Sequence, residues 1–357
     1  MVNLAFVGLD VGGANIKAVR IDVINGELQR IQTISRYFPI WRMGKDRLPS
    51  ILSELKEELV GSSILDGLCV TMTAELSDVY ESKRVGVEHI LDCVDSVFFG
   101  ANIKVIDVYS GLRSVSDAKR DYLSVAGANW AATAWLISQY IPTCILIDVG
   151  STTTDIIPIM NGKIAAKGLT DLERLASGEL IYTGALRTNI ATIVDEIPVR
   201  GKMVRVSSEL FALSGDVHLI LGNIGEEDYV TETADGRGRS KREALARLSR
   251  VVCADSDMLD VMDLEKIARY IYEEQLNVVS KGLLQVLSGI EMGFDVPIVT
   301  VGLGGKFIGA KAAERIGLKK IVDLAEILGK DNSRAISALA TGLRMAFEYG
   351  VKLPRWL

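Results

Sequence analysis

Phe6-Val-Gly-Leu-Asp10-Val-Gly12-Gly13 is an apolar segment that runs into an aspartate and two glycines, and a second apolar segment, Ile16 to Val23, follows it. The same order returns at Ile145-Leu-Ile-Asp148-Val-Gly150-Ser151-Thr152-Thr153, with Asp155 to Ile159 behind it. Each copy predicts two strands joined by a tight Asp-x-Gly turn. We expect the two turns to face each other as halves of one phosphate site.

The residue types in these turns suit an anionic ligand. Glycine lets the backbone approach a phosphate closely, so that consecutive N–H groups can donate to its oxygens. An aspartate at a strand end can hold Mg²⁺ while the metal bridges phosphoryl oxygens. A single Asp-x-Gly is common turn chemistry, but its repetition between apolar strands favours a binding site.

Composition predicts a globular enzyme of about two domains. The chain has 357 residues, of which 48% are hydrophobic and 24% charged, with a net charge of -6. The negative charge argues against nucleic-acid binding, and no apolar run reaches the roughly 18 residues that cross a membrane. The start, Met1-Val-Asn-Leu, lacks a signal core. We therefore expect a cytoplasmic protein with small-molecule substrates, and a homo-oligomer stays open.

Hydrophobic periodicity predicts an α/β fold in two similar halves. The first half has strand candidates at 4–9, 16–23, 27–34, 67–71 and 103–108 and helix candidates at 48–59 and 89–98. Asn25-Gly26 between apolar runs is a hairpin signal. The second half has strand candidates at 145–148, 155–160, 163–167, 217–222 and 297–301 and helix candidates at 241–252, 264–289 and 333–349.

A third glycine-rich segment, Ile298-Val-Thr-Val-Gly302-Leu-Gly304-Gly305-Lys306, completes a known pattern. With it the duplication resembles the superfamily of actin, hexokinase and the Hsp70 ATPase domain. The resemblance implies two actin-like (ribonuclease H-like) α/β lobes with a central cleft, at 1–125 and 126–333, and a C-terminal helix at about 334–357 that returns to the first lobe. It also implies that Gly302, Gly304 and Gly305 contact a nucleotide.

Four further segments narrow the family: 70–87, 127–133, 178–188 and 233–239. In these the chain resembles a small branch of the hydantoinase/oxoprolinase-like group, linked to tetrahydromethanopterin-dependent one-carbon metabolism. In methanogenic archaea this branch serves methanofuran biosynthesis, where it joins 5-(aminomethyl)-3-furanmethanol diphosphate to γ-glutamyltyramine. The resemblance therefore implies a transferase that forms an aryl ether, releases pyrophosphate and uses Mg²⁺.

The resemblance assigns roles to particular residues. Asp10 and Asp148 would orient Mg²⁺. The diphosphate would be bound by Gly12, Gly13, Asn15, Lys17, Gly150, Ser151, Thr152 and Thr153. The branch-specific segments add candidate substrate ligands, which are Lys83, Arg84, Asn129, Trp130, Glu179, Arg237 and Arg239. Arginine offers a bidentate fork for phosphate, although a solvated loop charge is an equal alternative for each basic residue, and core packing is the alternative for Trp130.

Removal of a proton from the phenol needs a base. Glu75 is the candidate, because a desolvated carboxylate has a raised pKa. Asp155, Glu179 and Asp235 compete with it, and a structural capping role for Glu75 is equally open. His89, on a predicted helix, and His218, in a predicted strand, lie in apolar segments and are predicted to be packing residues. The polar, glycine-containing segment 228–241 is the candidate lid.

Two other function classes stay open. An ATP-dependent small-molecule kinase or a hydantoinase/oxoprolinase-like hydrolase is favoured if the third glycine-rich turn still receives adenine. A non-catalytic nucleotide-binding regulator is disfavoured, because the chain shows no long partner-binding tail. Ala14-Asn15 stand where many phosphoryl-transferring relatives carry Thr or Ser, which weakens the case that ATP is hydrolysed.

Overall fold

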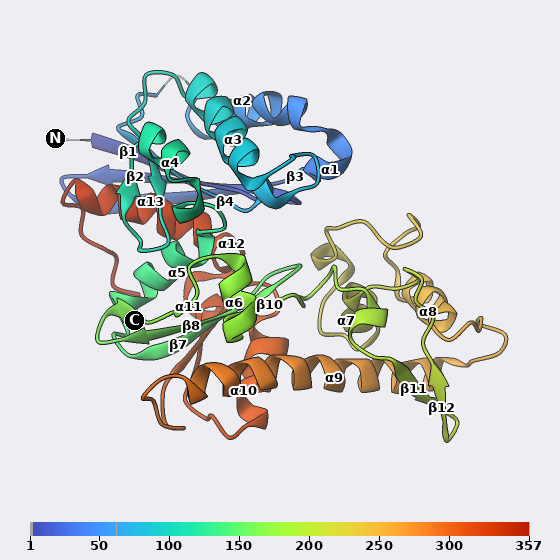
Figure 1. Ribbon diagram of the computed structural model, residues 1–357. Coiled ribbons are helices and arrows are strands. Elements are labelled where there is room, and N and C mark those ends of the chain that lie inside the picture. The colour runs from blue at the N-terminus through green and yellow to red at the C-terminus, as the bar shows by residue number, and fades with distance from the viewer. Residues whose placement is uncertain (1–2, 62, 357) are drawn as a thin grey trace. The chain divides into compact units, whose positions relative to one another are not determined.

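The computed structural model describes residues 3–61 and 63–356, which form a mixed α/β structure (Figure 1). Contacts divide the chain into two compact units. The first consists of residues 1–144, 157–174 and 324–357, and the second of residues 145–156 and 175–323. The chain therefore leaves the first unit after the fifth helix and returns to it twice.

The first unit is built on a sheet with the strand order β3-β2-β1-β4-β5-β6. β1 pairs antiparallel with β2 and parallel with β4, and β4 pairs parallel with β5. Asn25 and Gly26, both with positive φ, turn β2 into β3, as the Asn-Gly signal predicts. The strands are β1 (Asn3–Val11), β2 (Asn15–Ile24), β3 (Glu27–Tyr37), β4 (Gly67–Met72), β5 (Ile103–Ile106) and β6 (Leu112–Arg113).

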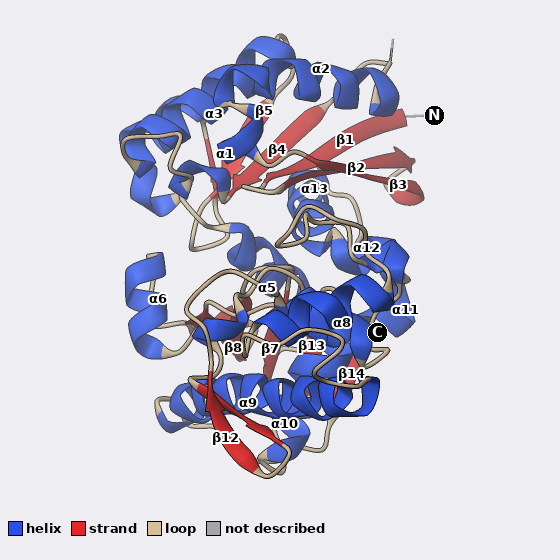
Figure 2. Cartoon of the chain, turned by 90° about the vertical axis from the view of Figure 1, so that its right-hand side faces the viewer, coloured by secondary structure: helices blue, strands red, loops and turns tan. Residues whose placement is uncertain are grey.

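Helices cover both faces of this sheet. Figure 2 shows α2 and α3 on one face and α13 on the other. α2 buries Leu48, Leu52, Leu55 and Leu59, which are the positions that the helical period predicts. The helices of this unit are α1 (Ile40–Met43), α2 (Leu48–Leu59), α3 (Lys83–Val97), α4 (Val115–Arg120), α5 (Asn129–Ser138), α11 (Leu324–Leu328), α12 (Lys330–Arg334) and α13 (Ile336–Glu348). The short helix α6 (Asp171–Ser177) begins in the first unit.

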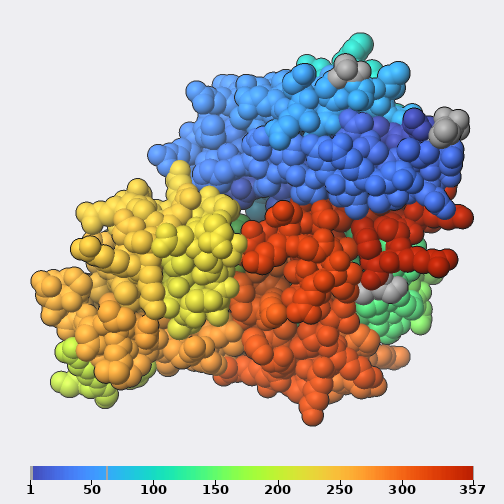
Figure 3. Space-filling view, turned by 180° about the vertical axis from the view of Figure 1, so that it is seen from behind, coloured from blue at the N-terminus to red at the C-terminus, as the bar shows by residue number. Residues whose placement is uncertain are grey.

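The C-terminal residues belong to the same unit as the N-terminal strands. The Thr33 hydroxyl donates to the Asn332 side chain at 2.8 Å, and the Lys352 N–H donates to the Gly26 carbonyl at 3.3 Å. In the space-filling view the red C-terminal segment lies against the blue strands (Figure 3). This segment closes the far face of the first sheet.

The second unit contains a sheet with the order β10-β8-β7-β13-β14, in which β9 also pairs with β8. The 28-residue helix α9 runs along this unit (Figure 1). The strands are β7 (Cys144–Val149), β8 (Thr154–Met160), β9 (Lys163–Ile164), β10 (Leu180–Ile181), β13 (Ile298–Val301) and β14 (Ile321–Asp323), with a separate hairpin of β11 (Glu196–Val199) and β12 (Lys202–Arg205). The helices are α7 (Ser214–Ile220), α8 (Lys241–Arg250), α9 (Val261–Ser288) and α10 (Lys311–Arg315).

One predicted element is of the wrong type, and the bounds of several others differ from the prediction. Residues 217–222, predicted as a strand, lie in and after the helix α7, and His218 is therefore on a helix. Every residue of α7 is buried, so its apolar run has no polar face that would reveal a helical period. The strand predicted at 163–167 ends at Ile164. α3 begins at Lys83, before the predicted 89, because the Ser82 hydroxyl accepts from the Val85 N–H at its first turn.

No helix among the described residues is long and apolar enough to cross a membrane.

In the first unit β1 and α13 approach each other closely at two glycines. A Cβ at Gly8 would lie 1.9 Å from the Ala338 carbonyl oxygen and 2.4 Å from the Gly342 nitrogen. A Cβ at Gly342 would in turn lie 2.9 Å from the Gly8 nitrogen. The helix can therefore rest directly on the strand only because both positions lack a side chain.

We predict that Gly8→Ala lowers the free energy of unfolding by about 3 kcal/mol or more, because the new methyl group must push α13 off the sheet. Urea unfolding followed by circular dichroism measures the change. Gly13→Ala is the matched control, because a Cβ there meets nothing within 4 Å. Equal stability of the two variants would contradict the close approach.

Candidate functional site

The first Asp-x-Gly turn is closed by its own backbone. The Gly12 N–H donates to the Asn15 carbonyl at 3.1 Å, and the Ala14 carbonyl accepts from the Phe38 N–H at 2.9 Å. A Cβ at Gly12 would lie 2.6 Å from the Asn15 oxygen, whereas one at Gly13 would meet nothing. The turn is thus fixed on one side and open at Gly13, as a backbone site for an anion requires.

Asp10 ends this strand as a buried carboxylate that is only half satisfied. Its Oδ2 accepts from the Ser337 hydroxyl of α13 at 2.5 Å, while Oδ1 has no hydrogen-bond partner. Burial raises the pKa of Asp10, against the opposing effects of the Lys17 charge and the Ser337 hydrogen bond. Lys17 lies directly opposite Asp10 in the β1–β2 register. A free buried oxygen of this kind fits a cation or a cation-bound water.

A metal ion at Asp10 would need further ligands from water and from the substrate. Among residues 3–61 and 63–356, no three His, Cys, Asp or Glu side chains are grouped as a metal site. Mg²⁺ usually keeps several waters and takes one or two carboxylates together with substrate phosphates. The donor set of the first turn fits that mode of binding.

Glu75 is the second buried carboxylate of the first unit. It lies in the turn Ala74–Leu76, is 1% exposed, and neither of its oxygens has a hydrogen-bond partner. Burial raises its pKa to about 8; the Lys83 charge opposes this rise, and the charges of Asp171 and Asp10 add to it. A Cβ at Gly86 of α3 would lie 2.7 Å from the Glu75 Cα, so the helix presses on this turn. Glu75 is therefore largely protonated at neutral pH.

Lys83 lies beside this carboxyl group and forms an ion pair. Its Nζ is 2.5 Å from Oδ2 of Asp171, the first residue of α6. Gly127, with a φ of +65°, lies so close that a Cβ would be 2.9 Å from the other Asp171 oxygen. The segments 70–87 and 127–133, separate in the sequence, thus meet residues 168–174. Asp171 carries no signal in the sequence, because nothing local marks a partner 88 residues away.

Two other predicted substrate ligands of the first unit, Trp130 and Arg84, have structural side-chain partners. The Arg174 guanidinium lies over the ring of Trp130, 4.3 Å from its centroid, and Trp130 is 1% exposed. The Arg84 guanidinium lies 4.3 Å from the ring centroid of Tyr122. Asn129 begins α5, and its carbonyl accepts from the Thr133 hydroxyl at 3.5 Å. Their roles as ligands stay predictions.

The second Asp-x-Gly turn repeats the first and is braced by the segment 183–188. The Gly150 N–H donates to the Thr153 carbonyl, and the Ala185 N–H donates to the Gly150 carbonyl, both at 2.9 Å. The Ser151 carbonyl accepts the backbone N–H groups of Leu186 and Arg187, both at 2.9 Å. The Arg187 side chain reaches the Thr152 hydroxyl at 3.3 Å. Arg187 is therefore a cation at this turn that the Asp-x-Gly pattern alone does not indicate.

The third glycine-rich turn packs on the second. Gly302, with a φ of +82°, lies where a Cβ would be 2.4 Å from the Val149 carbonyl oxygen and 2.7 Å from Oδ1 of Asp148. The Gly304 N–H donates to the same Val149 carbonyl at 3.0 Å. Gly305 then begins the π-helical turn η6 (Gly305–Ala310). The structure thus joins Asp148, the second turn and the third turn within one unit.

His218 and Gln275 support the segment that braces the second turn. The Gln275 amide donates to the Thr183 hydroxyl at 3.0 Å and to the Gly184 carbonyl at 2.9 Å. Its oxygen lies 3.0 Å from Nε2 of His218, whose pKa is lowered to about 3 by burial. A neutral, buried and hydrogen-bonded histidine is the packing residue that the sequence predicts.

Glu179, a predicted substrate ligand, is 2% exposed and comes directly before β10; its backbone carbonyl accepts from the Ile156 N–H at 2.8 Å.

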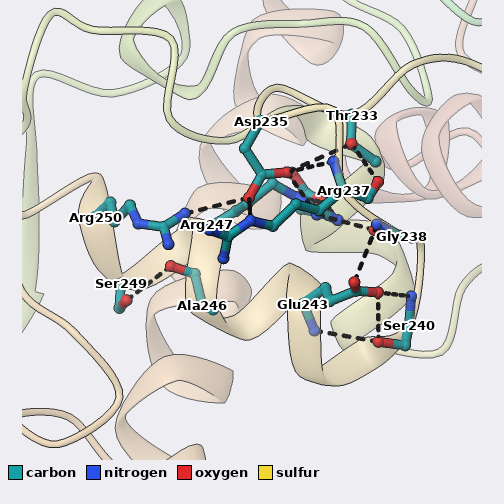
Figure 4. Close-up of polar contacts among 11 residues, drawn as sticks. Thr233, Asp235, Arg237, Gly238, Ser240, Glu243, Ala246, Arg247, Ser249 and Arg250 are labelled. Carbon is teal, nitrogen blue, oxygen red and sulfur yellow. Dashed lines mark hydrogen bonds and ion pairs between the residues drawn. The ribbon is translucent and has the colours of Figure 1, made fainter.

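The loop 233–240 is fixed by a buried arginine (Figure 4). Arg247 of α8 is fully buried; its Nε and Nη2 donate to Oδ1 of Asp216 at 2.9 and 2.7 Å. Its Nη1 donates to Asp235 at 3.1 Å and to the Gly238 carbonyl at 3.0 Å. Burial raises the pKa of Asp235, but the Arg237 N–H and the Arg247 charge outweigh it and hold that pKa below its usual range.

These contacts change two expectations from the sequence. An ionised Asp235 between Arg247 and Arg250 is poorly suited to be a base. The Thr233 hydroxyl also donates to the Arg237 carbonyl at 2.7 Å, and the Gly238 N–H donates to Glu243 at 3.0 Å, so these contacts favour a fixed loop over a lid. The Arg237 side chain itself is 68% exposed. The loop therefore presents this arginine to solvent on a rigid base.

The chain is similar to known proteins in sequence and in structure. Residues 66–343 match the hydantoinase/oxoprolinase family. A protein of Methanocaldococcus jannaschii, (4-{4-[2-(γ-L-glutamylamino)ethyl]phenoxymethyl}furan-2-yl)methanamine synthase, is 36% identical over 95% of this chain and 97% of its own length. The protein of the same name from Methanococcus vannielii is 36% identical over 62% of this chain and all of its own length.

Among solved structures, nucleotide-free acetone carboxylase has a TM-score of 0.54 to this chain at 10% identity. The match covers 96% of this chain and 70% of the other chain. At that identity the likeness concerns the fold alone. It confirms the predicted α/β fold class.

We predict that Glu75→Gln stabilises the protein increasingly as the pH rises. The folded protein keeps the Glu75 proton up to about pH 8, whereas the unfolded chain loses it near 4.5, so wild-type stability falls between these values, by at most about 1.4 kcal/mol per pH unit. Glutamine has no proton to lose. Urea unfolding between pH 5 and 9 tests this. The exposed Glu81→Gln is the control, and parallel curves for all three proteins would contradict the buried carboxyl.

Proposed function

The chain belongs to the hydantoinase/oxoprolinase family, and from this premise we propose that it is a synthase of methanofuran biosynthesis. It joins 5-(aminomethyl)-3-furanmethanol diphosphate to γ-glutamyltyramine and releases pyrophosphate. One observation carries the proposal: 36% identity over 95% of this chain and 97% of a relative that is named for the resulting ether. An alignment of 340 residues spans the segments 70–87, 127–133, 178–188 and 233–239.

The reaction that we propose is an alkyl transfer. The phenol oxygen of γ-glutamyltyramine forms a bond to the furanylmethyl carbon, and the bond from that carbon to the diphosphate oxygen breaks. The phenol proton goes to a base, and the leaving group departs as pyrophosphate. The substrate brings its own diphosphate, so the balance requires no ATP. The enzyme is then a transferase of an alkyl group to an aryl oxygen.

Glu75 is the base in this proposal. A phenol with a pKa near 10 transfers its proton with less difficulty to a carboxylate whose pKa is about 8 than to an ordinary carboxylate near 4.3. Both Glu75 oxygens lack a partner, so either could take the proton. This role predicts that the rate rises as the pH approaches 8 and then levels off.

The Asp-x-Gly turns are the proposed diphosphate ligands, each within its own unit. In the first, the open backbone at Gly13 and the Lys17 charge suit phosphoryl oxygens. In the second, the Thr152 hydroxyl and Arg187 do so. Asp10, with its free oxygen, and Asp148, beneath Gly302, are the proposed residues for Mg²⁺, which would neutralise charge on the departing diphosphate.

The proposal is tested by incubating the purified protein with Mg²⁺ and both substrates in the absence of ATP. Mass spectrometry should detect the coupled ether and an equal amount of pyrophosphate. Omitting γ-glutamyltyramine separates coupling from simple hydrolysis of the diphosphate. Ether formation that begins only when ATP is added would instead favour the kinase-like alternative.

We predict that Arg237→Ala lowers kcat/KM at least tenfold and leaves the melting temperature unchanged, because the side chain is exposed and the loop is fixed by other residues. Arg247→Ala should lower both, since it leaves Asp216 buried without its cation, at a cost of about 3–5 kcal/mol. Steady-state kinetics with each substrate varied shows which substrate Arg237 contacts. Unchanged kinetics in Arg237→Ala would remove it from the site.

A further inference from the structure

Asp171 is an acidic residue that the proposed chemistry does not use. It forms an ion pair with Lys83, whose charge acts on the proposed base, Glu75. Its Oδ2 is 2.5 Å from the Lys83 ammonium, and both side chains are 21% exposed. Lys83 and Asp171 are also the first two charged side chains that act on Glu75. The pair therefore brings one positive and one negative charge to a buried carboxyl group that has no hydrogen-bond partner of its own.

The surroundings fix Asp171 independently of Lys83. The N-terminal turn of α6 is capped by Glu173, whose carboxylate accepts from the Leu169 and Thr170 N–H groups at 2.9 and 3.0 Å. Behind it, a Cβ at Gly168 would lie 2.5 Å from the Arg174 nitrogen. Gly127 closes the remaining side, as described above. The backbone around Asp171 is thus fixed by contacts that do not involve Lys83.

We propose that Asp171 is a positioning residue: it holds the Lys83 ammonium in an ion pair, so that the ammonium does not bond to Glu75 and both oxygens of that carboxyl group stay free to take the phenol proton. The inference rests on the proposed function, in which Glu75 is the base. Among the described residues, the charges that act on Glu75 are those of Lys83 on α3, Asp171 on α6 and Asp10 on β1. The Glu75 charge in turn helps to raise the pKa of Tyr80, whose hydroxyl lies 2.9 Å from Nδ1 of His89. Asp10 and Asp171 oppose ionisation of Glu75, and Lys83 favours it.

Neutralising Asp171 and neutralising Lys83 should shift the titration midpoint of Glu75 in opposite directions. Asp171→Asn removes a negative charge and releases the ammonium, which both favour the ionised form of Glu75. Lys83→Met removes the positive charge and leaves Asp171 unopposed. The titration midpoint of Glu75 should therefore fall in the first variant and rise in the second, by roughly half to one pH unit each. Loss of packing alone would not produce shifts of opposite sign.

The experiment measures this midpoint directly, by carbon NMR of the full chain labelled at glutamate side-chain carboxyls. The Glu75 resonance is the one that disappears in Glu75→Gln. Glu173→Gln is the matched control, because it neutralises a carboxylate in the same turn of α6 that bonds to backbone N–H groups and not to Lys83. The pH dependence of kcat/KM is recorded for the same variants.

The expected result is a lowered midpoint in Asp171→Asn, a raised one in Lys83→Met and no change in Glu173→Gln, with the kinetic midpoint following each. An Asp171→Asn midpoint equal to that of the control would overturn the positioning role. The two proposals fail separately: NMR midpoints that shift as expected while Glu75→Gln keeps full kcat/KM would reject Glu75 as the base but retain the coupling of the three side chains.

Discussion

The absence of side chains at Gly8 and Gly342 is the constraint on which the first unit depends. β1 and α13 meet there at backbone distance. Asp10 lies two residues further along the strand than Gly8, on the same face, and it accepts a hydrogen bond from the Ser337 hydroxyl of α13. A helix held further away by even one methyl group could not bring this hydroxyl to Asp10. The orientation of the carboxylate at the first turn is therefore set by contacts that have no chemistry of their own.

The protein treats its buried carboxylates in two different ways. Asp216 has an arginine as close partner, and Arg247 makes further hydrogen bonds to Asp235 and Gly238, so the charges are satisfied within the fold. Asp10 and Glu75 are just as buried but keep oxygens without a partner. Burying an unsatisfied carboxyl group destabilises a fold, and native structures keep few such groups. The paired carboxylate of Asp216 helps to fix the loop 233–240, whereas the unpaired oxygens of Asp10 and Glu75 are suited to bind a ligand.

Local patterns in the sequence were enough to predict most of the fold. The apolar runs before Asp10 and Asp148 are strands, and the Asn25-Gly26 signal is a hairpin, since each depends on neighbouring residues alone. Residues 217–222 were assigned wrongly because a helix buried on all sides carries no periodic signal. The Lys83–Asp171 pair and the burial of Arg247 could not be predicted, because they depend on which distant segments meet. The raised pKa of Glu75 likewise depends on its burial and on the charges of Lys83 and Asp171, which the residues next to it in the sequence do not reveal.

The burial of Arg247 also separates two responses to ionic strength. Mobile ions screen exposed charges over a distance of about 8 Å at physiological salt but have little access to a pair in the interior. The contacts that shape the loop 233–240 thus persist in concentrated salt, while the attraction of the exposed Arg237 for an anion weakens. Added salt should therefore weaken anion binding at Arg237 without changing the conformation of the loop 233–240.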